Sequence, residues 1–100
     1  MHAAIRTYGV SNIEELTQLV RDEFLPIVET VPGFVAYYVV DAGDGTASSV
    51  TICEGKDGIE ESTSRAAAWV EERIPELIES GPTVLTRNVT VEASQLEIAA

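Results

Sequence analysis

The sequence predicts an α+β fold of the ferredoxin-like βαββαβ type. Three observations predict it: two segments with helical spacing of apolar residues, two β-rich segments joined by a Gly-rich turn, and one further β-rich segment near each end of the chain. Right-handed crossovers would place both helices on one face of a four-stranded antiparallel sheet and leave the other face bare. We expect residues 1–100 to form a single domain.

The first half of the chain gives a strand and a helix. Residues 3–8, "AAIRTY", have the composition of a strand. Ser11 and Glu14 then match a capping box at a helix start. The apolar residues that follow with helical spacing are Ile13, Leu16, Val20, Phe24 and Ile27. Pro26 predicts a kink or an early end, because proline has no N–H and its ring clashes with the carbonyl of Asp22.

A predicted hairpin follows the first helix. Its strands are residues 34–40 and residues 47–54, joined by "DAGDGT". Gly43 and Gly45 in this turn permit positive φ.

The second helix and the last strand complete the order. Asp57 with Glu60 predicts the helix start, and Pro75 predicts a short extra turn. The predicted inner stripe of the helix holds Ile59, Thr63, Ala66, Trp69, Val70 and Ile74. We expect "SGPT" to break the chain, residues 84–91 to form the last strand, and the remainder to be a tail.

The strand of residues 34–40 has no polar side. One alternating set is Phe34, Ala36, Tyr38 and Val40, and the other is Val35, Tyr37 and Val39. One set therefore leaves apolar groups on the helix-free face, which predicts that a second copy covers it. Burying a standard ~1,600 Å², about 65% apolar, gives a gross gain of about 25 kcal/mol, against an association cost of about 4–15 kcal/mol. Two further interpretations stay open: a monomer whose tail covers the face, or a dimer in which Leu96 and Ile98 of the tail reach the partner.

Composition narrows the function classes. Seventeen Asp and Glu against six Lys and Arg give a net charge of −11, so we expect neither nucleic acid nor an anionic membrane as partner. No long apolar run or export signal is present, and the expected compartment is the cytoplasm. Cys53 is the single cysteine, and with His2 it makes no metal set.

The element order, the block "FLPIVETVPGFVAYYVVDAGDGT" and the helix "SRAAAWVEE" resemble the dimeric α/β-barrel superfamily. The nearest group is the antibiotic-biosynthesis-monooxygenase-like (ABM-like) domains, including uncharacterised bacterial members. The resemblance extends over residues 3–91 and implies a homodimeric barrel. It does not fix an activity, since the superfamily includes monooxygenases, haem degraders, isomerases, dehalating enzymes and proteins with no known reaction.

The resemblance implies a pocket between helices and sheet. Cofactor-independent monooxygenases of this superfamily use a Trp on the second helix, an Asn one turn earlier, and Tyr and Arg residues. In this chain the residue one turn before Trp69 is Arg65 instead of Asn, which weakens the monooxygenase assignment. The candidate catalytic residues are Trp69, Arg65 and Arg87, and the candidate pocket residues are Phe24, Tyr37, Tyr38 and Trp69. The other interpretation of Trp69, which we favour, is that it is simply a large core residue.

Other candidates have plainer interpretations. Haem-degrading relatives need a His on the second helix, where this chain has none. Arg6 and Arg87 fall on neighbouring strands and are expected to form salt bridges or to bind an anionic substrate group. Cys53 is expected to be a buried, inert thiol. We expect no cofactor and no metal.

Two functions follow. The first is a homodimer with a pocket for a hydrophobic or aromatic small molecule, with cofactor-independent monooxygenation as its candidate activity. The second is a non-catalytic ligand-binding or stress-associated module, and whether the protein is an enzyme stays open. A cavity of roughly 300 Å³ or more around Trp69 favours the first, and a packed space favours the second.

Overall fold

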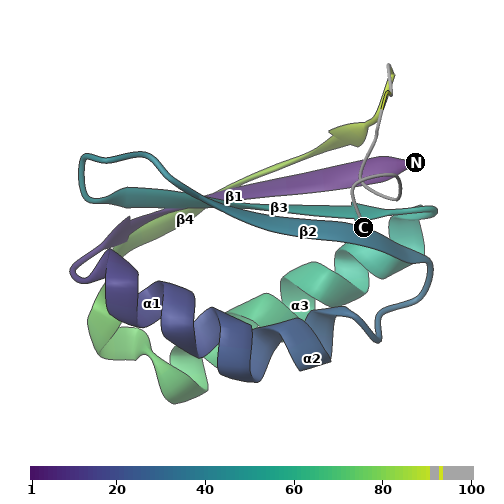
Figure 1. Cartoon of the computed structure of the whole chain (residues 1–100). Coiled ribbons are helices and arrows are strands. Elements are labelled where there is room, and N and C mark those ends of the chain that lie inside the picture. Colours follow the sequence, from purple (N-terminus) through teal and green to yellow (C-terminus); the bar gives the residue numbers. More distant parts are fainter. Residues whose placement is uncertain (91–92, 94–100) are drawn as a thin grey trace.

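The structure is a computed structural model that describes residues 1–90 and residue 93. In Figure 1, the helices lie on one face of a single sheet. The elements are β1 (His2–Val10), α1 (Ile13–Leu19), the π-helix η1 (Val20–Phe24), α2 (Leu25–Val28), β2 (Phe34–Asp41), β3 (Thr46–Cys53), α3 (Lys56–Arg73), the 3₁₀ turn η2 (Pro75–Leu77) and β4 (Ile78–Asn88). The predicted ferredoxin-like α+β fold is confirmed.

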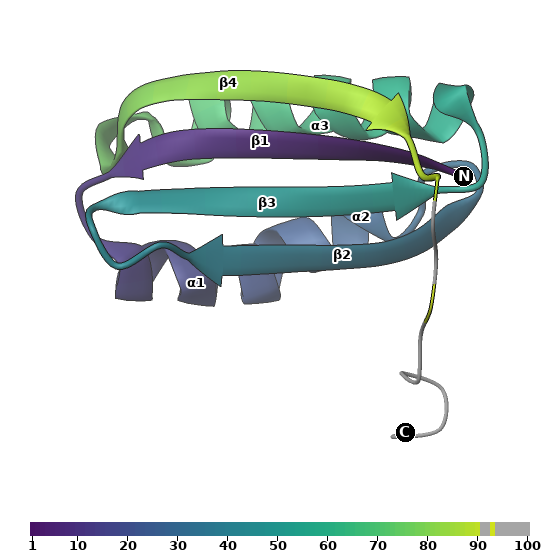
Figure 2. The ribbon, with the colours of Figure 1, turned by 90° about the horizontal axis from the view of Figure 1, so that it is seen from above.

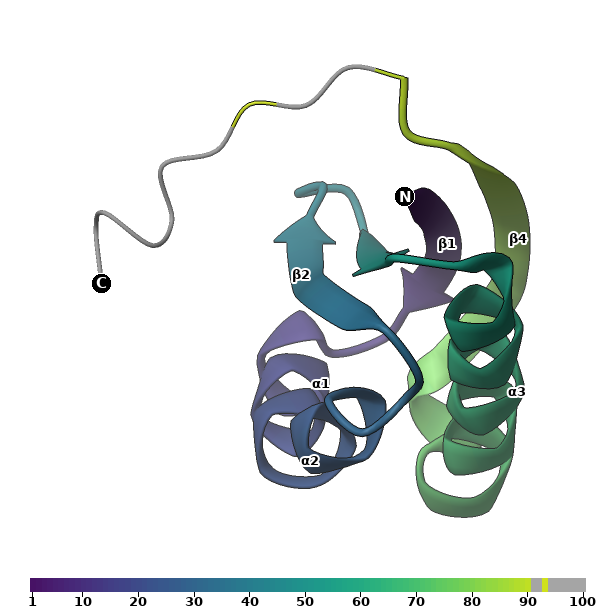
Figure 3. The ribbon, with the colours of Figure 1, turned by 90° about the vertical axis from the view of Figure 1, so that its right-hand side faces the viewer.

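The sheet has the order β2-β3-β1-β4, and each neighbouring pair is antiparallel. Figure 2 shows β2 and β4 at the two edges, with α3 under the β4 side and α1 and α2 under the β2 side. Figure 3, an end-on view, shows α1–α2 and α3 side by side beneath the same face. The first and last strands are thus neighbours, as predicted.

The first helical stretch departs from regular α geometry before Pro26. Residues Val20–Phe24 form a π-helix, in which the Leu25 N–H donates to the carbonyl of Val20. A widened turn directly before Pro26 suits a residue that has no N–H to donate to Asp22. The early end that we gave as one alternative is wrong, because α2 continues past Pro26 to Val28, and the irregular turn lies before the proline.

The predicted helix caps are wrong in both helices. Asn12, not Ser11, caps α1, because its side-chain oxygen accepts from the Glu15 N–H at 3.1 Å. Ser11 instead donates to the carbonyl of Leu77. The second helix, α3, begins at Lys56 after Gly55, which has no side-chain cap, and Asp57 lies inside its first turn.

The last strand has other bounds than the predicted residues 84–91, because it starts earlier and ends at Asn88. β4 begins at Ile78 and includes "SGPT", which we expected to break the chain. An edge strand tolerates Pro82 because half of its backbone groups face no neighbour. The register between β1 and β4 is irregular at Gly9, and Gly81 of β4 has φ +93°. These two features let β4 continue through "SGPT". Our prediction for Leu96 and Ile98 lies outside the described residues.

The two faces of the sheet differ in cover. On the helix side, Ala4, Tyr8 and Val10 of β1 are buried. The alternation that we predicted for residues 34–40 breaks at a register shift between Phe34 and Ala36. The residues of β2 that pack on the core are therefore Phe34, Tyr37 and Val39.

The helix-free face is apolar and exposed. Tyr38 and Val40 of β2 are 40% and 52% exposed, and Ile5 and Leu85, which pair across β1 and β4, are 37% and 44% exposed. The prediction of large apolar side chains on this face is confirmed. No helix among residues 1–90 is both long and apolar enough to cross a membrane.

Candidate functional site

An aromatic cluster occupies the core between the helices and the sheet. Phe24 of η1 lies between Trp69 of α3 and Tyr37 of β2, with ring centroids 5.3 Å and 5.6 Å away. The rings are tilted, as aromatic pairs usually are. Three of the four predicted pocket residues are therefore together.

The space beside this cluster is small. The cavity that Phe24, Tyr37 and Trp69 line has a volume of about 30 Å³. About 10–15 Å³ on this measure already holds one water molecule, and ligand pockets begin near 300 Å³. In this conformation the cavity accommodates water but not an aromatic ring, which favours the packed alternative for Trp69.

The indole N–H of Trp69 has a structural partner. It donates to Glu23 Oε1 at 3.3 Å, and the same carboxylate accepts two hydrogen bonds from Arg73 at 2.8 Å and 3.1 Å. The hydrogen bond from Arg73 is the main cause that lowers the pKa of Glu23. This cluster joins η1 to α3, so the N–H of Trp69 serves helix packing.

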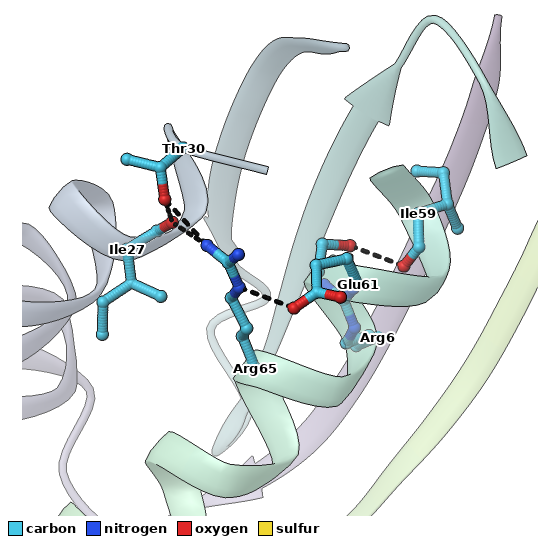
Figure 4. A network of polar contacts seen from close by, with 7 residues as sticks. Arg6, Ile27, Thr30, Ile59, Glu61 and Arg65 are labelled. Atoms are coloured by element: carbon cyan, nitrogen blue, oxygen red, sulfur yellow. Dashed lines mark hydrogen bonds and ion pairs between the residues drawn. The ribbon is translucent and has the colours of Figure 1, made fainter. Parts of the chain in front are cut away.

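Arg65 also joins the helices. Its Nη1 donates to the carbonyl of Ile27 at 3.2 Å and to Thr30 Oγ1 at 2.7 Å, and its Nε donates to Glu61 at 2.9 Å. Figure 4 shows the guanidinium group reaching from α3 to the segment around Thr30. Arg65 thus satisfies a carbonyl at the end of α2. It does not line the cavity beside Trp69.

Arg87 and Tyr38 lie on the opposite face of the sheet. Arg87 pairs with Ala3, whose neighbour Ala4 is buried toward the helices. Paired residues share a face, so Arg87 is directed away from Trp69. Tyr38 pairs with Val50 on the same helix-free side. The structure therefore does not bring these two candidates to the predicted pocket.

The salt bridges predicted for Arg87 and Arg6 are absent among the described residues, and the surroundings of Arg6 are polar but uncharged. The side chain of Arg6 is 1% exposed, and no carboxylate pairs with it among the described residues. Its Nη1 donates to Thr51 at 3.0 Å, and its Nη2 donates to Ser62 at 2.7 Å and Thr63 at 2.8 Å. Desolvation lowers the pKa of Arg6. The alternation of β1 predicts that Arg6 shares a face with Ala4 and Tyr8. It does not predict that no acidic side chain of the described residues pairs with Arg6.

Burial raises the pKa of two tyrosines and the cysteine near Arg6. Burial raises the pKa of Tyr37 to about 12, in spite of a hydrogen bond with Ser49 and the charge of Arg6. Burial also raises the pKa of Tyr8. Cys53 is buried, and burial raises the pKa of its thiol, as expected for an inert cysteine. Within residues 1–90 and 93, no three His, Cys, Asp or Glu side chains gather as a metal site.

A larger space lies on the other side of α3. We call it the α3–β4 groove; its volume is about 270 Å³. Its lining includes Thr63 and Ala67 of α3, Arg6 of β1, and Pro82 and Val84 of β4. Tyr8, Val70 and Ile78 line both this groove and the small cavity, so these side chains separate the two spaces.

Comparisons with known proteins add the fold context. No family model matches the chain, and no curated protein matches it. Several solved structures are similar. The NE2512 protein of unknown function from Nitrosomonas europaea has a TM-score of 0.79 at 14% identity, with 93% of this chain and 92% of that chain covered.

Two similar structures have a described activity. The monooxygenase ActVA-Orf6 of Streptomyces coelicolor, in complex with nanaomycin D, gives a TM-score of 0.69 at 16% identity, covering 92% of each chain. The haem degrader MhuD from Mycobacterium tuberculosis, with two haems in its active site, gives 0.72 at 19% identity, covering 94% of this chain and 100% of that one. At these identities the comparisons establish a shared fold, and they confirm the predicted ABM-like resemblance at that level.

Proposed function

We propose that this chain of ABM-like fold is a homodimer that binds a small hydrophobic or aromatic molecule in the α3–β4 groove. The observation that carries the ligand-binding part is the groove itself, a space of about 270 Å³ with apolar side chains of Ala67, Val70 and Val84 in its walls. This volume approaches the lower limit of about 300 Å³ for ligand pockets, whereas the cavity beside Trp69 is far below it.

The homodimer part rests on the helix-free face. Apolar side chains are exposed on this face along β1, β2 and β4, namely Ile5, Tyr38, Val40 and Leu85. Large exposed apolar patches mark interaction surfaces in soluble proteins. A second copy of the same face offers an apolar surface of matching extent, as an isologous dimer requires.

A matched pair of variants tests the dimer. Val40→Lys places a charge on the helix-free face, while Val84→Lys places one on the helix side at similar exposure, 52% against 43%. Light scattering of the wild type should give twice 10.8 kDa. Val40→Lys should give the single-chain mass, and Val84→Lys should remain dimeric. A folded wild type of single-chain mass would refute the dimer.

Titration with 2-naphthol tests the ligand site. Amide signals of Ala67, Val70 and Val84 should move in nuclear magnetic resonance spectra as the ring fills the groove. Ala67→Leu should weaken binding, because the larger side chain occupies the groove. Signal changes confined to the Trp69 cluster would place the site in the small cavity and contradict the groove.

A second candidate function is cofactor-independent monooxygenation. Trp69 and Tyr37, which both pack on Phe24, favour it, in a fold that the monooxygenase ActVA-Orf6 shares. The protein should then accelerate oxygen uptake by a hydroquinone, and Trp69→Phe should slow it with the fold intact. An unchanged rate would remove the role of Trp69. Haem degradation has less support, since the only histidine, His2, lies in β1.

A further inference from the structure

Among the residues that the structure describes, Arg6 is a buried cation without an anion. The three ion pairs among the described residues join Lys56 to Glu60, Arg65 to Glu61 and Arg73 to Glu23. Removing a guanidinium group from water is costly unless an opposite charge compensates it. A chain with 17 acidic residues nevertheless places hydroxyl groups around this one.

The hydroxyl groups leave part of Arg6 unsatisfied. A guanidinium group has five N–H donors, and Arg6 uses three of them, on Thr51, Ser62 and Thr63. Its Nε is buried and has no hydrogen-bond partner within residues 1–90 and 93. Buried donors without partners are rare in folded proteins and call for an explanation.

The position of Arg6 offers that explanation. Arg6 and its partner Thr63 both line the α3–β4 groove, whose other walls are mainly apolar. The groove therefore combines a hydrophobic wall with a cation and a hydroxyl group at one place. Glu71 is the one carboxylate among its lining residues, and it is exposed on α3.

We infer that Arg6 is the anion-recognising residue of the α3–β4 groove and that the ligand is a hydrophobic or aromatic acid. The ring or alkyl part lies against Ala67, Val70 and Val84, and the carboxylate accepts hydrogen bonds from Arg6 and Thr63. This inference rests on the proposed ligand-binding function and adds the charge of the ligand. A carboxylate is suited to a guanidinium group because both are planar and paired hydrogen bonds align.

Two probes of the same shape test the inference on the full chain. 2-Naphthoate carries a carboxylate, and 2-naphthamide replaces it with a neutral amide. Calorimetric titration of the wild type should show about 10- to 100-fold tighter binding of 2-naphthoate, as expected for hydrogen bonds to a charged group. Arg6→Met should reduce this ratio to about one.

Matched variants separate the effect of the charge at Arg6 on the binding ratio from the effect of the net charge of the protein. Arg21→Met removes an exposed cation from η1 and changes the net charge equally, so it should keep the wild-type ratio. Arg6→Lys keeps the positive charge but loses the planar guanidinium group, so it should keep part of the preference for 2-naphthoate. A spectroscopic readout that needs no variant is the ¹⁵N signal of Arg6 Nε, which should move with 2-naphthoate and not with 2-naphthamide.

The outcomes are distinct. Equal binding of the two probes by the wild type, or a ratio that survives in Arg6→Met, overturns the role of Arg6 and leaves the proposed binding function standing. Binding of neither probe overturns both. If Arg6→Met does not fold, a stationary Arg6 Nε signal at saturating 2-naphthoate overturns the inference.

Discussion

The two flanks of α3 are packed in opposite ways. Toward η1 and β2, Trp69 and Ala66 are 8% and 6% exposed and leave a cavity of only about 30 Å³. Toward β4, Ala67 is exposed and Val84 of the strand is 43% exposed, beside a groove of about 270 Å³. One helix thus borders both a densely packed part and an open part of the helix-covered side.

The difference follows from what lies opposite each flank. On the first, Phe24 and Tyr37 supply large rings that meet Trp69. On the second, β4 is an edge strand, and the small Ala67 faces it without a second helix to close the space. Dense packing stabilises the fold, and a ligand can enter only where the packing is incomplete.

The largest expected effect is on the packed flank. Trp69→Ala should lower the free energy of unfolding by about 3–5 kcal/mol, because it removes a buried aromatic and leaves a cavity. Val84→Ala, on the open flank, should cost about 0.5 kcal/mol. Urea unfolding at equal protein concentration measures both. Similar losses from the two substitutions would contradict the contrast.

Adjacent alanines give a sharper comparison. Ala66 lines the small cavity and Ala67 lines the groove. Ala66→Leu should destabilise by about 1–3 kcal/mol through overpacking, whereas Ala67→Leu should change stability by about 0.5 kcal/mol or less. Thermal unfolding of the two variants checks this. If Ala67→Leu proved the more damaging, the groove would not be free space.

The sequence allowed the fold to be predicted wherever the signal was local and strong. Helical spacing, the Gly-rich hairpin turn and Pro75 all led to the observed elements. The caps were wrong because several neighbouring polar residues fit the start of each helix, and only the structure shows that Asn12 binds the Glu15 N–H. The prediction that "SGPT" breaks the chain was wrong because Pro82 is acceptable in an edge strand, and the edge position is a tertiary property.

The candidate site was predicted less well, for a related reason. Alternation along a strand gives two sets of side chains but not which set faces the helices, and Arg87 and Tyr38 fell on the helix-free face. The shift between Phe34 and Ala36 adds a change of phase that no local pattern shows. Arg6 required a three-dimensional view, because its significance is that no carboxylate of the described part of the chain pairs with it.

The smallest expected effect concerns pH and the ion pair on the packed flank. The hydrogen bond from Arg73 lowers the pKa of Glu23 in the folded protein below its ordinary value of 4.5. A lowered folded-state pKa means that this stabilisation is present above pH 4.5 and is lost as the pH falls below it. Glu23→Gln should therefore have a lower free energy of unfolding than the wild type at neutral pH. The difference between the two free energies should shrink on acidification.

Glu71→Gln is the matched control, since Glu71 lies at the groove and forms no ion pair among the described residues. The difference in free energy of unfolding between Glu71→Gln and the wild type should not shrink on acidification as it does for Glu23→Gln. Urea unfolding across an acid series measures both differences. A difference for Glu23→Gln that stays constant far below pH 4.5 would mean that the carboxylate charge does not hold η1 to α3, and that ring packing of Trp69 on Phe24 alone makes this flank dense.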